Sequence, residues 1–348
     1  MKNKFVIIEN SSTAFYKIEK YLLEYGENVV RYQEIEDALH SRDGSSIAQL
    51  IENKISTYSK EISAFIIDLQ LNDRDKYGGL HAIKSIRSAS NPNNDSYWRS
   101  FVPIIVYTNY PDQEENAMDE GASIVIKKID SLEEDIDFED MNSQEAKELN
   151  IHLSTKLLPN FTAFCNWYTA AINNIERSPI DIKGAEINFY RNNKTSPSIK
   201  HGFIMTSFDK KHDESIKQSI QEVEEKFQIK MHIANSNGET ANQLLNNIMG
   251  LMNCCDFGVG IYFNDYKKGS IINPNLSLEV GYMLGLNKEI CYLKNVELDH
   301  LNNDLASKIY TKYKNKDLVK YKKIPFMKEA LIKWIEDNSR IIGIRKRK

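Results

Sequence analysis

The sequence predicts an α/β protein with two doubly wound, flavodoxin-like parallel-sheet domains joined by a helical connector. Short apolar runs, typical of buried parallel strands, alternate with amphipathic segments over residues 1–130 and again over 201–340. Between them, residues 131–200 carry apolar side chains at helical spacing and end in a polar stretch rich in turn-forming residues. We therefore expect a first domain at 1–130, a connector at 131–200 and a second domain at 201–340.

The first domain contains five apolar runs of strand length with helical patterns between them. Strands are expected at residues 5–8, 28–32, 64–68, 102–108 and 121–128, and helices at 15–25, 47–59 and 79–87. Functional groups of such sheets collect at the carboxyl ends of the strands. The strand ends carry Glu9, Asp68, Thr108 and Lys128. Two acids, a hydroxyl and an amine together can hold a hard divalent cation and a phosphoryl group.

These residues give the first domain a resemblance to response-regulator receiver domains over nearly its full length. Asp68 matches the phospho-accepting aspartate, and Glu9 matches an acidic metal ligand. Thr108 matches the switch hydroxyl, and Lys128 matches the lysine of a Gly-Ala-x5-Lys pattern that begins at Gly121. The resemblance implies phosphorylation of Asp68 and a histidine kinase or another signalling partner.

The resemblance also implies a Mg²⁺ site, for which we expect the ligands Glu9, Asp68 and Gln70. Asn10 stands where the family usually has a second acid, and Ile129 stands where it has proline. An amide oxygen still coordinates a hard cation, so the loss of one carboxylate weakens such a site without removing it. The alternative is a degenerate receiver that serves as a docking surface.

The connector has an apolar stripe that is unusually aromatic. Its pattern is interrupted at Pro159 and contains Phe164, Trp167 and Tyr168. One interpretation is packing against the neighbouring domains. The other is a dimerisation helix or a signalling connector, and a dimerisation helix would make the protein a homo-oligomer.

The second domain repeats the alternation of the first. Strands are expected at 202–205, 229–234, 257–263 and 290–293, and helices at 212–227, 236–252, 278–286 and 327–335. The strand-end rule then gathers a set of polar and aromatic residues around one crevice that binds substrate. The expected substrate-binding residues are Ser207, Phe208, Asp209, Asn235, Asp265, Asn275 and Tyr282.

The third helical segment of the second domain, at 278–286, is preceded by turn-forming residues, Asn-Pro-Asn at 273–275. Ser277 is a good N-cap, which would put Glu279 in the first turn, where the helix dipole keeps a carboxylate ionised at neutral pH. Gly281 and Gly285 share one face and are expected to let this helix lie close against the sheet. The alternative is that Glu279 only stabilises the start of its helix and has no role in a site.

The pattern Asn-Pro-Asn-x3-Glu-x-Gly-Tyr-x-x-Gly over 273–285 resembles the signature of the nucleoside 2-deoxyribosyltransferase-like and TIR-like nucleotide-binding families. The resemblance spans about residues 202–295 and implies that Glu279 is the catalytic carboxylate at the anomeric carbon of a ribosyl group. These families often have Asp-Leu-Thr at the end of the third strand, where this chain has residues 261–263, Ile-Tyr-Phe. The role of the missing acid therefore falls to Asp265 or Asp209, or is absent.

This departure bears on the reaction. A neutral base must be protonated to leave, whereas nicotinamide leaves NAD⁺ as a neutral molecule from a cationic bond. A site with one clearly assigned catalytic carboxylate therefore fits NAD⁺ cleavage best. We expect a signal-regulated hydrolase of NAD⁺ or a related nucleotide, which by the resemblance would serve in bacterial anti-phage defence. The alternatives are a non-catalytic nucleotide sensor and a nucleoside deoxyribosyltransferase.

Length and composition exclude several other classes. The 348 residues suffice for two domains, and a net charge of −4 gives no overall attraction to nucleic acid or anionic membranes. Four cysteines without Cys-x-x-Cys spacing argue against a disulfide framework and a zinc site. With no signal peptide and no apolar run of membrane-spanning length, we expect a cytoplasmic protein with neither a membrane nor a nucleic-acid partner.

Overall fold

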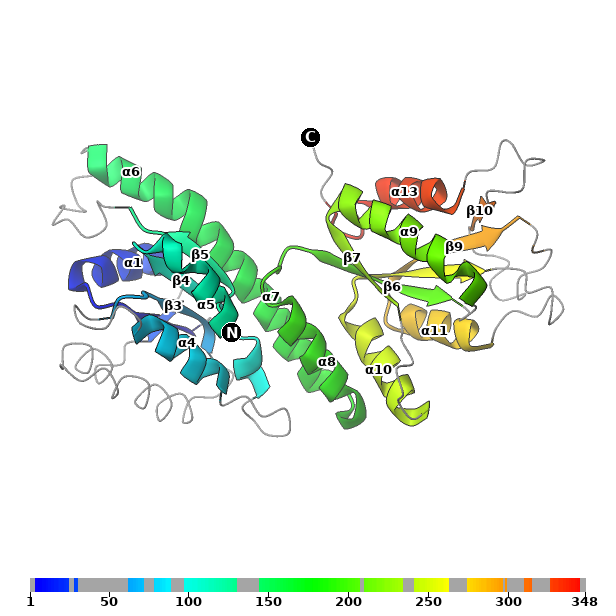
Figure 1. Ribbon diagram of the computed structural model, residues 1–348, viewed down its shortest axis with the longest axis horizontal. Coiled ribbons are helices and arrows are strands. Elements are labelled where there is room, and N and C mark those ends of the chain that lie inside the picture. Colours follow the sequence, from blue (N-terminus) through cyan, green and yellow to red (C-terminus); the bar gives the residue numbers. More distant parts are fainter. Residues whose placement is uncertain are drawn as a thin grey trace. The chain divides into compact units, whose positions relative to one another are not determined.

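The fold divides into two units, each built on one parallel sheet (Figure 1). The computed structural model describes residues 4–24, 28–30, 62–71, 78–88, 97–129, 144–206, 210–233, 241–262, 274–296, 298, 310–314 and 326–344. Unit 1 comprises Met1–Ser178 and Ile187–Ser198, and unit 2 comprises Pro179–Glu186 and Ile199–Lys348. The division runs through one helix, α8 (Ile180–Asn193).

The sheet of unit 1 has five parallel strands in the order β2-β1-β3-β4-β5. The strands are β1 (Lys4–Ile8), β2 (Asn28–Val30), β3 (Ile62–Ile67), β4 (Ile104–Thr108) and β5 (Ile124–Lys127). β3 and β4 are buried along their whole length, which explains their continuous apolar sequences. This is the flavodoxin-like order, so the predicted fold class is confirmed, and the switch point lies between β1 and β3. The helix predicted at 47–59 lies outside the described residues.

Helices cover both faces of this sheet. The core on one face joins alternate strand residues, such as Ile66 and Ile105, to α1 (Ser12–Glu24), α6 (Gln144–His152) and α7 (Leu158–Arg177). The helices α4 (Gly78–Ser88) and α5 (Glu114–Glu120) pack on each other and cover the opposite face (Figure 1).

The helical pattern of the predicted connector changes just before Pro159. A π-helical turn, Leu153–Leu157, joins α6 to α7, and the Leu158 N–H donates to the Leu153 carbonyl. Pro159 lies in the first turn of α7, where a missing N–H costs little, so the irregularity is the π turn that precedes it.

The aromatic stripe of α7 is used in packing within unit 1. Phe164 and Tyr168 are buried. The ring of Phe101 lies 5.7 Å from that of Tyr168, 6.3 Å from that of Trp167 and 5.8 Å from that of Tyr190, measured between centroids. These contacts correspond to the packing interpretation of the stripe. The homo-oligomer stays a prediction.

The sheet of unit 2 repeats the same strand order, β7-β6-β8-β9-β10, with all pairs parallel. Its strands are β6 (Lys200–Thr206), β7 (Ile229–Ile233), β8 (Phe257–Tyr262), β9 (Glu289–Asn295) and the unpredicted β10 (Thr311–Tyr313). One face packs on α9 (Lys210–Phe227) and α13 (Met327–Asn338). The other face is covered by α10 (Ala241–Cys254) and α11 (Pro274–Gly285) (Figure 1). The first residues of the helix predicted at 236–252, residues 236–240, lie outside the described residues.

The close approach of α11 to the sheet comes from glycines of the strand. A Cβ atom at Gly258 of β8 would lie 3.1 Å from Met283 Cε, and one at Gly260 would lie 3.4 Å from a methyl group of Val280. A Cβ atom at Gly281 or Gly285 would meet nothing within 4 Å. The prediction that Gly281 and Gly285 face the sheet is therefore wrong, because the apolar side chains of α11 occupy that face instead.

All four cysteines are free, as expected of reduced thiols. Within the described residues, no helix is both long and apolar enough to cross a membrane.

Candidate functional site

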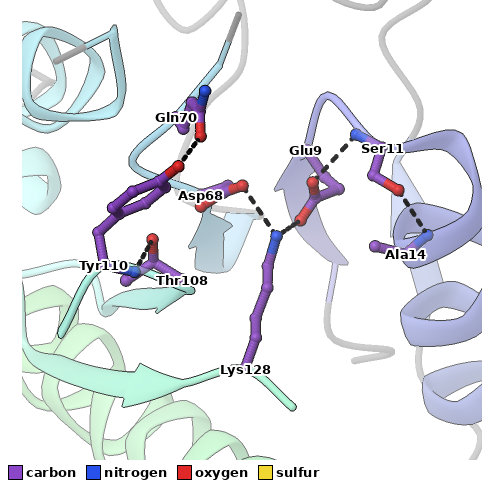
Figure 2. A network of polar contacts seen from close by, with 8 residues as sticks. All are labelled: Glu9, Ser11, Ala14, Asp68, Gln70, Thr108, Tyr110 and Lys128. Carbon is purple, nitrogen blue, oxygen red and sulfur yellow. Dashed lines mark hydrogen bonds and ion pairs between the residues drawn. The ribbon is translucent and has the colours of Figure 1, made fainter. Parts of the chain in front are cut away.

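The strand ends of unit 1 carry a buried ion network centred on Lys128 (Figure 2). Lys128 Nζ lies 2.7 Å from Glu9 Oε2 and 2.8 Å from Asp68 Oδ2. Glu9 follows β1 and Asp68 follows β3, so the two acids meet at the switch point, and the Asp68 N–H donates to the Ile8 carbonyl over 2.9 Å. Lys128 follows β5 and is anchored by its own N–H on the Thr108 carbonyl, also over 2.9 Å. The structure thus brings together three residues predicted from the strand-end rule.

Burial and mutual attraction set the charges of this network. Burial raises the pKa of Glu9 to about 7, with Lys128 opposing the rise and Asp68 adding to it. Burial lowers the pKa of Lys128, but the two carboxylates more than offset this, and its pKa is raised. Lys128 therefore stays charged at neutral pH and compensates the negative charge of its partners.

One carboxylate oxygen of Asp68 has no hydrogen-bond donor among the described residues. Asp68 Oδ2 accepts from Lys128, while Asp68 Oδ1 is buried and accepts no hydrogen bond from any residue that the structure describes. Glu9 uses Oε1 to accept from the Ser11 N–H over 3.0 Å. A buried carboxylate oxygen without a donor is costly unless something else binds it. Asp68 Oδ1 is thus a carboxylate oxygen of this network that keeps its acceptor capacity unused among the described residues.

The predicted Mg²⁺ ligands are only partly brought together. Asp68 Oδ1 suits a hard cation, and Glu9 is close enough to share Lys128 with Asp68. Gln70 lies apart from Glu9 and Lys128, and its Oε1 accepts from the Tyr110 hydroxyl (Figure 2). Across the described ranges, three or more His, Cys, Asp or Glu residues nowhere gather into a metal-binding group. A cation here would rest on Glu9 and Asp68, with other oxygens completing its shell.

Thr108 lies at the same end of the sheet and is fully buried. Its Oγ1 accepts from the Tyr110 N–H over 3.3 Å (Figure 2). Tyr110, which sequence reasoning missed, therefore connects Thr108 to Gln70 through its backbone and its hydroxyl. No periodic pattern marks this residue, since it lies in the loop after β4.

A glycine also shapes the site. A Cβ atom at Gly79, in the first turn of α4, would lie 2.2 Å from the Asp68 carbonyl oxygen and 2.5 Å from Leu69 Cα. The Gly79 N–H donates to the Leu69 carbonyl over 2.9 Å. The start of α4 thus lies directly against the backbone that carries Asp68.

In unit 2, Glu279 lies in the second turn of α11, because the helix begins at Pro274 and Ser277 is already inside it. Proline suits the first helical position, which explains the earlier start. Glu279 is only 9% exposed, and burial raises its pKa to about 7. The prediction that Glu279 lies in the first turn is therefore wrong, and with a pKa of about 7 its carboxyl group is about half ionised at neutral pH. Desolvation outweighs the helix dipole at this depth.

Glu279 makes no hydrogen bond or ion pair with any described residue, and its raised pKa has burial as its one cause. Three residues later, the Tyr282 hydroxyl donates to Asn253 Oδ1 of α10 over 2.9 Å. Residues three apart share a side of a helix, so Glu279 lies on the side of α11 that faces α10.

The other predicted substrate-binding residues stay predictions. Asn275 is exposed at the start of α11, and the Tyr282 hydroxyl has Asn253 as its partner. The predicted residues outside the described part of the chain are Ser207, Phe208, Asp209, Asn235 and Asp265.

Two hydroxyls at the strand ends of unit 2 were not singled out from the sequence. Thr206 Oγ1 at the end of β6 and the Tyr262 hydroxyl at the end of β8 are buried without a hydrogen bond to any described residue. Tyr262 occupies the segment where the resembled families often have an acid. Only its place at a strand end could have marked it.

Comparisons with known proteins bear on unit 1. No protein-family model matches the chain, and no curated protein matches it. The receiver domain of the TMAO respiratory system response regulator TorR aligns over 98% of its own length with 45% of this chain, at 16% identity and a TM-score of 0.26. The signal receiver domain of a protein described as a Luxo repressor, from Vibrio parahaemolyticus, aligns over 98% of its length with 47% of this chain, at 16% identity and a TM-score of 0.24. At such values, neither match says what this chain does.

Proposed function

We propose that this chain is a signal-regulated N-glycosidase. Unit 2 would cleave the bond between ribose and base in NAD⁺ or a related nucleotide, and unit 1 would control it as a receiver-like domain. The observation that carries the proposal is Glu279, a buried carboxyl group that no described residue pairs with and whose pKa is raised to about 7. A desolvated carboxylate without a partner among the described residues destabilises the fold, and such groups are often catalytic.

The reaction needs one carboxylate and one water molecule. The bond between the ribose C1′ and the nicotinamide nitrogen breaks, and nicotinamide leaves with the electron pair as a neutral molecule. The ionised Glu279 carboxylate would stabilise the positive charge that develops at C1′. Water then bonds to C1′ and releases a proton. Because the ionised form acts, the rate should rise with pH around 7.

Unit 1 would receive the signal at Asp68. Its Oδ1 has no donor among the described residues, while Lys128 holds Oδ2 and would also neutralise a phosphoryl group attached to the carboxylate. Mg²⁺, held by Glu9 and Asp68, would neutralise charge on the incoming phosphoryl group. The phosphoryl donor would be a histidine kinase or another signalling partner. In the resembled families such outputs serve anti-phage defence, and NAD⁺ loss on infection would halt the host.

Nicotinamide release by the purified full chain tests the enzymatic part. The protein is incubated with NAD⁺, with and without acetyl phosphate and Mg²⁺, beside Glu279→Gln. We expect release from the parent and a loss of about 100-fold or more in the variant. Glu289→Gln is the matched control, because Glu289 is an exposed carboxylate in the same unit. Intact NAD⁺ with tight nucleotide binding would instead support a sensor, and deoxyribose transfer between bases would support a transferase.

Labelling by acetyl phosphate tests the regulatory part. The parent should take up one phosphoryl group in the presence of Mg²⁺, and Asp68→Asn should take up none. Asp119→Asn, an exposed aspartate of α5, is the control and should label like the parent. An unlabelled parent would make unit 1 a docking domain.

A further inference from the structure

A buried acid on α8 belongs to neither site described above. Glu186 is fully buried, and its Oε1 accepts from Asn253 Nδ2 of α10 over 2.8 Å. Asn253 Oδ1 in turn accepts from the Tyr282 hydroxyl of α11 over 2.9 Å. All three residues belong to unit 2. Two side-chain hydrogen bonds therefore connect α8, α10 and α11 in series.

The hydrogen bond to Glu186 sets the direction of this series. Asn253 turns its NH₂ group towards Glu186 and donates to Oε1. Its carbonyl oxygen then faces Tyr282, and the phenol must donate. A neutral residue with an acceptor oxygen in place of Glu186 would therefore keep both hydrogen bonds of the series. An apolar residue there would remove the first of them.

The packing of α8 on α10 leaves little freedom at the first link. A Cβ atom at Gly250 would lie 2.6 Å from Ala185 Cβ and 3.1 Å from the Ile182 carbonyl oxygen. Ala185 adjoins Glu186, and Gly250 lies one turn before Asn253. The two backbones are thus as close as glycine allows at the point where the hydrogen bond forms.

The far end of α11 is also tied to α10. Lys288 Nζ donates to the carbonyl of Met252 over 3.0 Å, to that of Asn253 over 2.5 Å and to that of Cys255. These contacts fix where the C-terminal end of α11 lies, and the packing of Val280 and Met283 against β8 sets which side of the helix faces the sheet. The Tyr282 hydroxyl bond further restricts the rotation of α11 on the side that faces α10.

Glu279 lies three positions before Tyr282 on the same side of α11. A rotation of α11 that moves Tyr282 away from Asn253 therefore also turns the Glu279 carboxylate. We infer that Glu186 is a positioning residue for Glu279: through Asn253 and Tyr282 it limits the rotation that the packing of α11 still allows, and with it the direction of the carboxylate. This inference rests on the proposed function of Glu279.

Kinetics of four variants test the inference with NAD⁺ as the probe. Tyr282→Phe removes only the last hydrogen bond, and Glu186→Leu removes the first acceptor. Both should lower kcat by between about 10- and 100-fold, with KM changed little, since a small misplacement of a reacting group has effects of this size. Glu186→Gln keeps an acceptor oxygen and should recover most of the rate. The double variant Glu186→Leu with Tyr282→Phe should be no slower than the slower single variant, because both break one series.

Two results would overturn the inference. A raised KM with unchanged kcat in Tyr282→Phe would assign its hydroxyl to the substrate. Additive losses in the double variant would mean that Glu186 and Tyr282 act independently. Asp181→Asn is the control, since Asp181 is exposed on the same helix, and its kcat should equal that of the parent.

A second measurement needs no activity, so it separates failure of this inference from failure of the proposed function. Glu279→Gln should raise the melting temperature of unit 2 more at pH 8 than at pH 5, because only the ionised carboxylate opposes burial. In the Tyr282→Phe and Glu186→Leu backgrounds this difference should shrink, as the rotated carboxylate gains solvent. An unchanged difference in both backgrounds would show that the series does not position Glu279.

Discussion

The two units share a strand order but treat a buried acid in opposite ways. In each, burial raises the pKa of one glutamate to about 7. In unit 1, Glu9 shares Lys128 with Asp68, so the acids have a counter-charge 2.7 and 2.8 Å away. In unit 2, Glu279 has no such partner among the described residues. Unit 1 thus gives its two buried acids a shared counter-charge, whereas the buried acid of unit 2 has none among the described residues.

Removing the counter-charge of unit 1 should have the largest effect on stability. Lys128→Met leaves Glu9 and Asp68 buried without their cation, which should lower the free energy of unfolding by about 3–5 kcal/mol. Urea titration at pH 8 measures this, and the fluorescence of Trp98 and Trp167 reports on unit 1. A further variant that adds Glu9→Gln and Asp68→Asn should regain much of the loss. A loss well under 1 kcal/mol for Lys128→Met would mean that the acids of unit 1 do not depend on it.

Removing the charge of Glu279 in unit 2 should instead raise the free energy of unfolding. The folded pKa of Glu279 exceeds its ordinary value of 4.5, so the folded state binds more protons than the unfolded state between about pH 4.5 and 7. The stability that the protonated group gives is present below pH 4.5 and lost as pH rises through 7. Glu279→Gln should therefore be more stable than the parent at pH 8 by roughly 3 kcal/mol and equal to it near pH 4.5.

Trp334 lies on α13 in unit 2, so its fluorescence measures this change during urea unfolding. Glu289→Gln should leave the pH dependence as it is, since Glu289 is exposed. A variant that is less stable than the parent at pH 8 would reveal a partner for the Glu279 carboxylate.

Substitution of a glycine in unit 1 should have a smaller effect on stability. Gly79→Ala puts a Cβ atom against the backbone of Asp68 and Leu69, so we expect unit 1 to lose about 1–3 kcal/mol and Asp68 to label more slowly with acetyl phosphate. The measurements are urea unfolding and phosphoryl uptake. Normal stability with normal labelling would show that the start of α4 can shift without disturbing Asp68.

Gly281→Ala should have the smallest effect, and it should stabilise. The position is exposed, helical and open, so alanine adds helix propensity without a clash, which is worth about 0.5–1 kcal/mol. Thermal unfolding of unit 2 checks the sign. A destabilised Gly281→Ala would restore the packing role that the sequence suggested.

Much of unit 1 could be predicted because its signals are local. Continuous apolar runs identify buried strands, and the residue after each run lies at the sheet edge where sites form, which was enough to find Glu9, Asp68 and Lys128. Tyr110 could not be found in this way, since its role depends on a loop that folds back towards Gln70.

Unit 2 shows where local signals fail. Ser277 is a good cap, but Pro274 starts the helix one turn earlier and moves Glu279 inward. The spacing of Gly281 and Gly285 shows that they share a face, but not which face meets the sheet. That depends on Gly258 and Gly260, which admit the apolar side of α11. The series from Glu186 to Tyr282 joins three helices far apart in the chain, and no period or spacing predicts such a contact.

The most direct test of the central claim is the rate of nicotinamide release from NAD⁺ as a function of pH. The full chain is treated with acetyl phosphate and Mg²⁺, and the parent is compared with Glu279→Gln from pH 5 to 9. The account predicts a rate that rises with a midpoint near pH 7 in the parent and a flat, near-zero rate in the variant. Equal rates in the two proteins, or NAD⁺ left intact by the phosphorylated parent at every pH, would contradict it.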